Sequence, residues 1–253
     1  MKIVAVIPAR YKSTRFPGKP LADICGKPMI WWVYQEAKRV ARFSDVIVAT
    51  ESGIIVEACQ KLGMKVMLTS DSHPTGTDRA AEVAQHIDAD LYVIIMGDEP
   101  LIKACDEERL LDALDKMPGS DAVMLTEKFI DPVDVTNMTT IKLAINDDGH
   151  LVFMSRAAIP YPKEAIGYSF YKNVGCYALK KEALDFYLKT NPGNIERAEG
   201  IELLRLLENH KLIVTVPINS KSMAVDTEKD LEKIRHVIQN DFDKMRLLEN
   251  YYE

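Results

Sequence analysis

The stretch that decides the fold is Ile3-Val4-Ala5-Val6-Ile7, which runs through Pro8-Ala9-Arg10 into Ser13-Thr14-Arg15-Phe16-Pro17-Gly18-Lys19-Pro20. An unbroken apolar run indicates a strand that is buried on both faces. The loop after it carries three cations, Arg10, Arg15 and Lys19, among hydroxyl and proline residues. Cations, hydroxyls and a closely approaching backbone at the carboxyl end of a first strand suit a polyphosphate. The loop therefore predicts a nucleoside triphosphate site, although basic loop residues are more often solvated surface charge.

Strand and helix patterns alternate along the first half of the chain. Apolar runs predict strands, and helical spacing predicts helices between them, over residues 4–7 (strand), 29–41 (helix), 45–50 (strand), 54–62 (helix), 65–69 (strand), 78–87 (helix) and 91–96 (strand). Continuous apolar strands between helices are typical of a parallel sheet covered on both faces. We expect an α/β fold with a Rossmann-like, doubly wound, mostly parallel sheet. Right-handed crossovers then bring the loops after the first and fourth strands together.

The pattern changes after about Gly119. A hairpin signal joins residues 141–145 and 151–154 around Asp147-Asp148-Gly149, and further elements are predicted over 122–125 (strand), 171–179 (strand), 195–208 (helix), 212–217 (strand) and 228–250 (helix). We interpret residues 1–126 and 211–253 as a nucleotide-binding α/β domain. Residues 127–210 are predicted to be an antiparallel α+β insertion that binds an acceptor and forms a homodimer.

Composition excludes several classes of protein. A net charge of −6 argues against nucleic-acid binding, which needs a basic surface. The four cysteines form no C-x-x-C pair, which favours reduced thiols over a disulfide or zinc framework. No apolar run approaches the roughly 20 residues of a membrane span, and no signal peptide pattern is present. We expect a cytoplasmic protein that contacts no membrane.

Two carboxylates are candidate Mg²⁺ ligands. Asp98, in Gly97-Asp98-Glu99-Pro100, follows the most apolar strand, where a carboxylate faces the ligand crevice of a parallel sheet. Magnesium takes carboxylate oxygens together with substrate phosphates. Asp226 precedes the last helix, and on the residues alone a helix N-cap is the stronger interpretation for it. Thr77 also opens a helix and has the same two interpretations.

Taken together, the motifs resemble the 3-deoxy-manno-octulosonate (KDO) cytidylyltransferases. The matching stretches occur in the family's order and cover nearly the whole chain: Ile7-Pro8-Ala9-Arg10-Tyr11-x-Ser13-Thr14-Arg15-x-Pro17-Gly18-Lys19-Pro20-Leu21, Gly26-Lys27-Pro28-Met29-Ile30, Val48-Ala49-Thr50, Gly76-Thr77-Asp78-Arg79, Gly97-Asp98-Glu99-Pro100, Ser155-Arg156-Ala157-x-Ile159-Pro160 and Val225-Asp226-Thr227. Each stretch alone is a weak signal, whereas the ordered series is specific.

The resemblance implies a sheet of nucleotidyltransferase type, and transfer of CMP from CTP to an acidic sugar with release of pyrophosphate. It assigns CTP binding to Pro8, Ala9, Arg10, Ser13, Thr14, Arg15, Lys19, Thr77 and Arg79. It makes Asp98 and Asp226 the Mg²⁺ ligands, and Lys19, Asp98 and Arg10 the catalytic set. An acceptor oxygen attacks the α-phosphorus in line, and catalysis is positioning plus charge stabilisation.

The departures from the family pattern lie on the acceptor side. Met96, Asn173 and Leu203 stand where the family usually has glutamine, histidine and glutamine, whereas Arg156, Tyr177 and Glu202 are retained. We assign all six to the acceptor site. Replacing polar partners by Met and Leu removes recognition of hydroxyl groups. The acceptor is therefore KDO, a KDO-like acid, or another small anion such as an amino-sugar acid, a phosphonate or a phosphorylated metabolite.

A glycosyltransferase or a non-catalytic nucleotide-binding module on the same fold is the alternative from another class. A glycosyltransferase of this architecture would carry Asp-x-Asp at the carboxyl end of a strand. The nearest candidate, Asp88-Ala89-Asp90, precedes its strand instead. A non-catalytic module would be expected to lose Lys19 or a magnesium carboxylate, and this chain keeps both.

Overall fold

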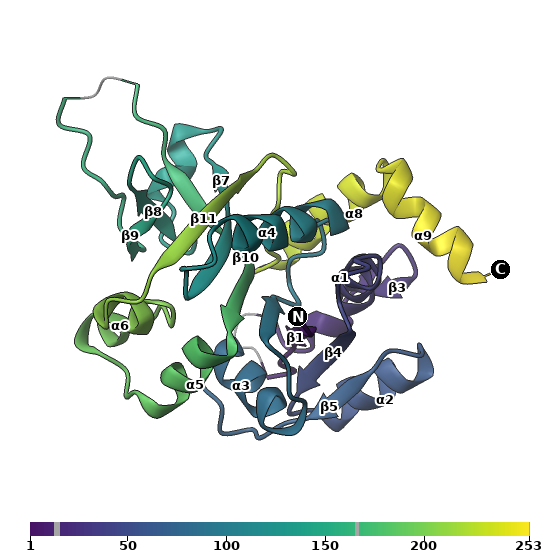
Figure 1. The fold of residues 1–253 in the computed structure, drawn as a ribbon. Helices are drawn as coiled ribbons and strands as arrows, with labels where there is room; N and C mark the ends of the chain where they lie inside the picture. Colours follow the sequence, from purple (N-terminus) through teal and green to yellow (C-terminus); the bar gives the residue numbers. More distant parts are fainter. Residues whose placement is uncertain (13–15, 165–166, 253) are drawn as a thin grey trace.

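A mostly parallel sheet forms the centre of the molecule (Figure 1). The computed structural model describes residues 1–12, 16–164 and 167–252. The main path of the sheet has the order β11-β7-β10-β6-β1-β4-β5. Its strands are β1 (Ile3–Pro8), β4 (Asp45–Thr50), β5 (Val66–Leu68), β6 (Leu91–Ile95), β7 (Ala122–Lys128), β10 (Tyr171–Lys180) and β11 (Ile213–Ile218). β10 runs antiparallel to both of its neighbours, β6 and β7. The predicted doubly wound α/β fold is confirmed.

Helices cover both faces of this sheet, and each face has its own apolar core. Alternate residues of β1 point to opposite faces, so Ala5 and Ile7 join one core while Val4 and Val6 join the other. The first core includes residues of α1 (Met29–Lys38), α2 (Gly53–Lys61), α4 (Ala104–Lys116) and α8 (Glu228–Gln239). The second includes residues of α3 (Gly76–His86), α5 (Lys181–Lys189) and α7 (Leu204–Glu208). The strand pattern that predicted burial on two faces is thereby explained.

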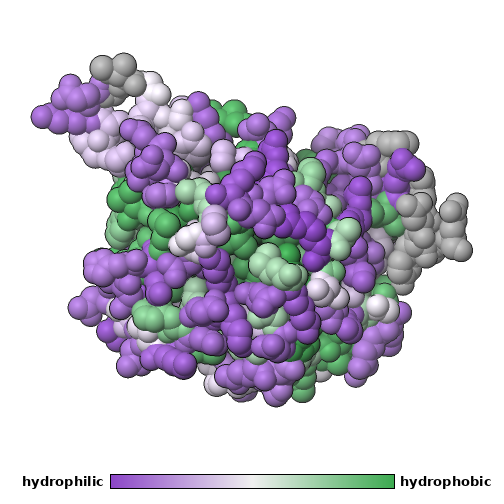
Figure 2. All heavy atoms as spheres, in the orientation of Figure 1, coloured by the Kyte–Doolittle hydropathy of each residue, from purple (hydrophilic) through white to green (hydrophobic). Residues whose placement is uncertain are grey.

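The second half of the chain adds a hairpin to one end of β10. β8 (Lys142–Ile145) pairs with β9 (Leu151–Ser155) and with the start of β10. The segment around this hairpin stands out from the body of the molecule (Figures 1 and 2). β10 belongs to the range predicted as an insertion, yet its residues 176–180 pair with β6 in the main sheet. The division into a nucleotide domain and an acceptor domain stays a prediction about function.

Two predicted long helices are each divided into two. The helix expected over 195–208 is α6 (Asn194–Glu199) followed by α7, because Gly200 has φ 62° and ends α6 in the left-handed conformation. The helix expected over 228–250 is α8 followed by α9 (Phe242–Tyr252). There the Asp241 carboxylate accepts from the backbone N–H of Lys244 at 3.1 Å and pairs with Lys103 at 2.8 Å, which starts a new helix.

The remaining elements are short or were not predicted. The sequence patterns did not predict helices α4 and α5, which the structure contains. Short elements complete the fold: two 3₁₀ turns, η1 (Lys19–Leu21) and η2 (Pro132–Thr136), and a small hairpin of β2 (Asp23–Ile24) and β3 (Lys27–Pro28). Among the described residues, no helix has the length and apolar character that crossing a membrane requires.

Candidate active site

The loops after β1 and β6 touch because Gly97 has no side chain. Its N–H lies 3.3 Å from the Pro8 carbonyl oxygen. A Cβ at Gly97 would lie 2.9 Å from both that oxygen and Ile30 Cδ1, closer than real Cβ contacts allow. Parallel pairing of β1 with β6 places both loops at the same edge of the sheet. The expected contact between these two loops is therefore present, and it brings Asp98 beside the first loop.

Lys19 joins three segments that are distant in sequence. Its Nζ donates to Asp98 Oδ2 at 2.6 Å and to the Val225 carbonyl oxygen at 2.7 Å, and it lies 3.9 Å from Asp226 Oδ1. The backbone N–H of Val225 in turn donates to the Asp98 carbonyl oxygen at 2.9 Å. Gly18, with φ 71°, adopts the left-handed turn that precedes Lys19. One ammonium group is thus held between two carboxylates.

A cavity of about 210 Å³ opens beside Lys19. Its lining combines three cations with the N-terminus of α3 and both carboxylates, and consists of Pro8, Ala9, Arg10, Lys19, Pro20, Pro74, Thr75, Gly76, Arg79, Met96, Gly97, Asp98 and Asp226. Unpaired N–H groups and the helix dipole favour an anion at a helix N-terminus. The cavity therefore suits an anionic ligand such as a polyphosphate.

Arg79 is fixed before any ligand arrives. Only 2% of the residue is exposed. Its guanidinium pairs with Glu51 at 3.0 Å and donates to Thr69 Oγ1 at 2.9 Å and to the Ser70 carbonyl oxygen at 3.0 Å. Burial is the main reason that its pKa is lowered, although an arginine remains charged. A preorganised cation of this kind needs little rearrangement to face a phosphate.

The predicted nucleotide residues fall into three groups. Pro8, Ala9, Arg10, Lys19 and Arg79 line the cavity. Thr77 does not belong to its lining, since the Thr77 side chain is buried and its hydroxyl contacts Tyr177 Oη at 2.8 Å. The other three predicted nucleotide residues, Ser13, Thr14 and Arg15, lie outside the described residues.

Thr75 lines this first cavity, where Thr77 was expected. Sequence reasoning did not select Thr75, although it N-caps α3 through a capping box with Asp78. The signal that could have found it is the T-x-x-D spacing just before an amphipathic helix.

A second, larger cavity of about 490 Å³ adjoins the first and shares Pro74, Thr75 and Met96 with it. Five of the six predicted acceptor residues line it: Met96, Asn173, Tyr177, Glu202 and Leu203.

Arg156 is not part of the lining of the second cavity. Its guanidinium donates to the carbonyl oxygens of Glu199, Met138 and Gly200 at 2.9, 3.2 and 3.4 Å. The structure therefore shows Arg156 supporting the loop beside the cavity, and direct acceptor contact by Arg156 stays a prediction.

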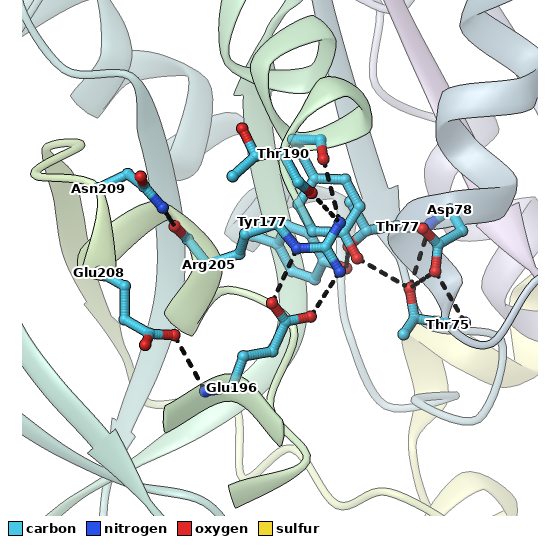
Figure 3. Close-up of polar contacts among 10 residues, drawn as sticks. Thr75, Thr77, Asp78, Tyr177, Thr190, Glu196, Arg205, Glu208 and Asn209 are labelled. Carbon is cyan, nitrogen blue, oxygen red and sulfur yellow. Dashed lines mark hydrogen bonds and ion pairs between the residues drawn. The ribbon is translucent and has the colours of Figure 1, made fainter. Parts of the chain in front are cut away.

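A buried ion pair between Arg205 and Glu196 belongs to the lining of the second cavity (Figure 3). Arg205 donates to both carboxylate oxygens of Glu196, at 2.8 and 2.6 Å, and to the Tyr187 carbonyl oxygen at 3.0 Å. Its guanidinium also lies 3.8 Å from the centre of the Tyr187 ring. The Tyr187 hydroxyl reaches Thr75 Oγ1 at 3.3 Å. This chain of contacts fixes α6 and α7 relative to the N-terminus of α3.

Tyr177 places Glu202 in the second cavity. The Tyr177 hydroxyl donates to Glu202 Oε1 at 2.7 Å and is contacted by Thr77. Burial, with help from the Glu202 carboxylate, raises the pKa of the Tyr177 phenol well above its usual value, so the hydroxyl stays protonated and keeps donating. Thr77 therefore supports the second cavity, through Tyr177.

Glu99 is a functional candidate that sequence reasoning missed. Its buried carboxylate accepts from the Gly175 N–H at 3.0 Å and from Ser222 Oγ at 2.5 Å. These contacts link β10, which carries Asn173 and Tyr177, to the loop that carries Asp226. Burial raises the pKa of Glu99 to about 7. The sequence placed it next to Asp98 but held no indication of its partners, which are 76 and 123 residues away.

Comparisons with known proteins agree with this geometry. A family model described as cytidylyltransferase matches residues 4–213. The 3-deoxy-manno-octulosonate cytidylyltransferase of Escherichia coli is 39% identical over 234 residues, which cover 92% of this chain and 95% of that protein. The chain belongs to the KDO cytidylyltransferase family. It is therefore a nucleotidyltransferase, as the motif series predicted.

One more relative and two solved structures extend the comparison for this cytidylyltransferase. The Photobacterium profundum relative is 40% identical and covers 94% of this chain and 100% of that protein. A solved structure of CMP:2-keto-3-deoxy-manno-octonic acid synthetase complexed with CTP is 38% identical, with a TM-score of 0.89 over 94% of this chain and 99% of that one. A cytidylyltransferase from Leptospira borgpetersenii, 18% identical with a TM-score of 0.67 over 99% of this chain and 94% of that one, shares the fold alone.

The two carboxylates of this cytidylyltransferase fit a magnesium ion. Among the described residues, no cluster of three or more His, Cys, Asp or Glu side chains could hold a metal. Magnesium, however, is usually bound by one or two carboxylates together with substrate phosphates. Asp98 and Asp226 converge on one cation, the Lys19 ammonium, so their oxygens already face a point where positive charge is stabilised. The donor set is therefore suitable for Mg²⁺ once phosphate oxygens complete it.

Proposed function

We propose that this protein transfers the cytidylyl group of CTP to a hydroxyl of KDO or a KDO-like acid and releases pyrophosphate. The observation that carries the proposal is the pair of adjoining cavities. One presents cations, carboxylates and a helix N-terminus, and the other presents Tyr177, Glu202 and Asn173. They meet at Pro74, Thr75 and Met96, where an acceptor hydroxyl and an α-phosphate would come together. Relatives that are about 40% identical carry the KDO cytidylyltransferase name.

The reaction is an in-line displacement at the α-phosphorus. The acceptor oxygen forms a bond to phosphorus and loses its proton, while the bond between the α-phosphorus and the bridging oxygen breaks and pyrophosphate leaves. Enzymes accelerate such transfers by positioning and by neutralising charge. Arg10, Lys19 and Arg79 would hold the phosphates in place. Magnesium, when held by Asp98 and Asp226, would supply further stabilisation of the phosphate charge.

Lys19 is the central group of the proposed mechanism. Its ammonium can reach both carboxylates and the nucleotide cavity, so a short movement would transfer its donors from Asp98 to a phosphate oxygen. Arg79 is held by Glu51, Thr69 and Ser70 and would act as a fixed cation. The remaining predicted nucleotide contacts, Pro8 and Ala9, offer backbone at the end of β1.

A pyrophosphate-release assay tests the proposal. The protein is incubated with Mg²⁺, KDO and one of CTP, UTP or ATP. We expect release with CTP and KDO, a much slower reaction with UTP or ATP, and no release without the acid. Failure with CTP and every acid tried, combined with release from UTP or ATP, would remove the cytidylyl assignment. Retention of activity after chelation of all divalent cations would remove the role of Mg²⁺.

We also infer that two copies of the chain form a homodimer through the segment between β7 and β10. Large apolar side chains on this segment are strongly exposed: Ile130, Val133, Met138 and Tyr161. Contiguous exposed apolar patches usually mark an interaction surface, and we infer that these four side chains contribute to one. Light scattering should give twice the mass of the chain, and a monomer at micromolar concentration would contradict this inference. The cytoplasmic location remains a prediction from the sequence.

A further inference from the structure

Four apolar side chains line the second cavity, which is proposed above to bind the acceptor. Met96 follows β6, Ile141 precedes β8, Met154 lies in β9 and Leu203 precedes α7, and all four line the cavity. They are not isolated, because they pack into the second core of the molecule, with Met154 and Leu203 buried and Met96 and Ile141 against them. This group of four is called the apolar wall below. Because these four side chains are apolar and are packed in the core, the wall offers a ligand no side-chain hydrogen-bonding group.

Several polar groups around the same cavity already have partners. The Arg205 guanidinium is bound to Glu196 and to the carbonyl oxygens of Tyr187 and Thr190. The Tyr177 hydroxyl lies between Thr77 and Glu202. These groups shape the cavity, but most of their donors and acceptors already form hydrogen bonds within the protein.

The groups that can bind an acceptor are other polar members of the same lining. Asn173 lines the cavity, and its buried Oδ1 has no hydrogen-bond donor among the described residues, a state that costs free energy until a donor reaches it. Glu202 has a second carboxylate oxygen beyond the one that Tyr177 contacts. Arg197, which is exposed and also lines the cavity, contacts Asn194 Oδ1 at 3.5 Å, which leaves its guanidinium able to turn toward an anion. The lining of the cavity therefore offers an exposed cation, hydrogen-bond acceptors and a group of hydrocarbon side chains.

We propose that the preferred acceptor is a KDO-like acid in which the group facing the apolar wall is a hydrogen or an alkyl group instead of a hydroxyl, and that KDO itself is the poorer substrate. This inference rests on the proposed function. Met96 belongs to both cavities, so it would contact the acceptor next to the reacting hydroxyl, whereas Leu203, Ile141 and Met154 would contact atoms farther from it. A hydroxyl placed against such a wall loses its bonds to water and gains none.

Kinetics with matched acceptors test the inference. Pyrophosphate release is measured at saturating CTP and Mg²⁺ with KDO and with its 4-, 5-, 7- and 8-deoxy analogues. A hydrophobic site discriminates against one added hydroxyl by up to about 100-fold. We therefore expect one analogue to exceed KDO in kcat/KM by about 10- to 100-fold, with the analogues that lose a needed hydroxyl falling below KDO.

The failure of this inference is distinct from that of the proposed function. If KDO equals or exceeds every analogue, the preference is absent and the inference is wrong, while CTP-dependent transfer stands. If no acid supports release of pyrophosphate from CTP, the proposed function is wrong, and the inference that rests on it is wrong as well.

Variants of the wall show whether it is the cause. Leu203→Gln places an amide of similar length in the wall and should reduce the ratio of the analogue's kcat/KM to that of KDO by about 10-fold. Met96→Gln is the second variant and should change the ratio in the same direction. Leu203→Met is the matched control, because a volume-conserving apolar change leaves the wall intact and the ratio unchanged. The ratio is insensitive to partial unfolding, so an unchanged ratio in both glutamine variants would show that the wall does not set the preference.

Discussion

Replacing Asp98 by asparagine should abolish transfer and leave the fold intact. Asp98 Oδ2 accepts from Lys19 Nζ at 2.6 Å, and Asp226 Oδ1 lies 3.9 Å from the same nitrogen. The substitution removes one of two negative charges that face this point and one of two carboxylates proposed for Mg²⁺. Loss of one preorganised electrostatic group in an active site lowers kcat by about 10²–10³, which is about 3–4 kcal/mol of activation free energy. We expect Asp98→Asn to lose at least this much.

The stability cost of the same change should be small. The Asp98 side chain is 24% exposed, and partly exposed ion pairs contribute about 1 kcal/mol or less to the free energy of unfolding. Asparagine can still accept from Lys19, and the bond from the Val225 N–H to the Asp98 carbonyl oxygen involves only backbone. Urea denaturation should therefore place Asp98→Asn within about 1 kcal/mol of the wild type.

The assay for Asp98→Asn is pyrophosphate release at saturating CTP, Mg²⁺ and acceptor, with Asp115→Asn as the matched control. Asp115 pairs with Arg42 on the surface, far from the nucleotide cavity, and its loss should leave kcat unchanged. A well-folded Asp98→Asn enzyme with kcat within tenfold of the wild type would refute the reasoning, because neither the metal site nor the pairing with Lys19 would then be needed.

Three further outcomes are expected. Gly175→Ala places a Cβ 2.9 Å from atoms of Met96 and Glu99, so it should lower stability by about 1–3 kcal/mol and slow transfer, whereas Gly119→Ala, which meets nothing within 4 Å, should be neutral by both measurements. Arg205→Met leaves the buried Glu196 carboxylate without its cation and should lower the free energy of unfolding by about 3–5 kcal/mol, measured by urea denaturation. A decrease of less than about 1 kcal/mol would contradict this expectation. Burial, with Glu36 nearby, raises the pKa of Glu107 well above 4.5, so the native carboxyl keeps a proton that the unfolded chain releases, and the contribution of Glu107 to stability should fall as pH rises above 4.5. Glu107→Gln should lack that component of the fall, and parallel stability curves for the two proteins from pH 4 to 8 would exclude this role.

Local patterns predicted the framework of the protein well. The strands over 3–8, 45–50 and 91–95 are continuous apolar runs, and only a sheet covered on both faces buries such runs. Parallel pairing with regular crossovers then forces Asp98 toward the loop of Lys19. Helix ends were less predictable, because Gly200 and Asp241 each divide a helix that apolar spacing alone would have continued.

The sequence by itself determined the parallel core, the cation-bearing loop and the carboxylate after β6, because each is encoded within one short segment. Only the tertiary structure decided that Thr75 lines the cavities while Thr77 supports Tyr177, that Glu99 links β10 to the loop of Asp226, and that Met96 belongs to both cavities. These facts depend on contacts between segments about a hundred residues apart. Such contacts are set by how the two cores pack around the sheet, which no local pattern in the chain specifies.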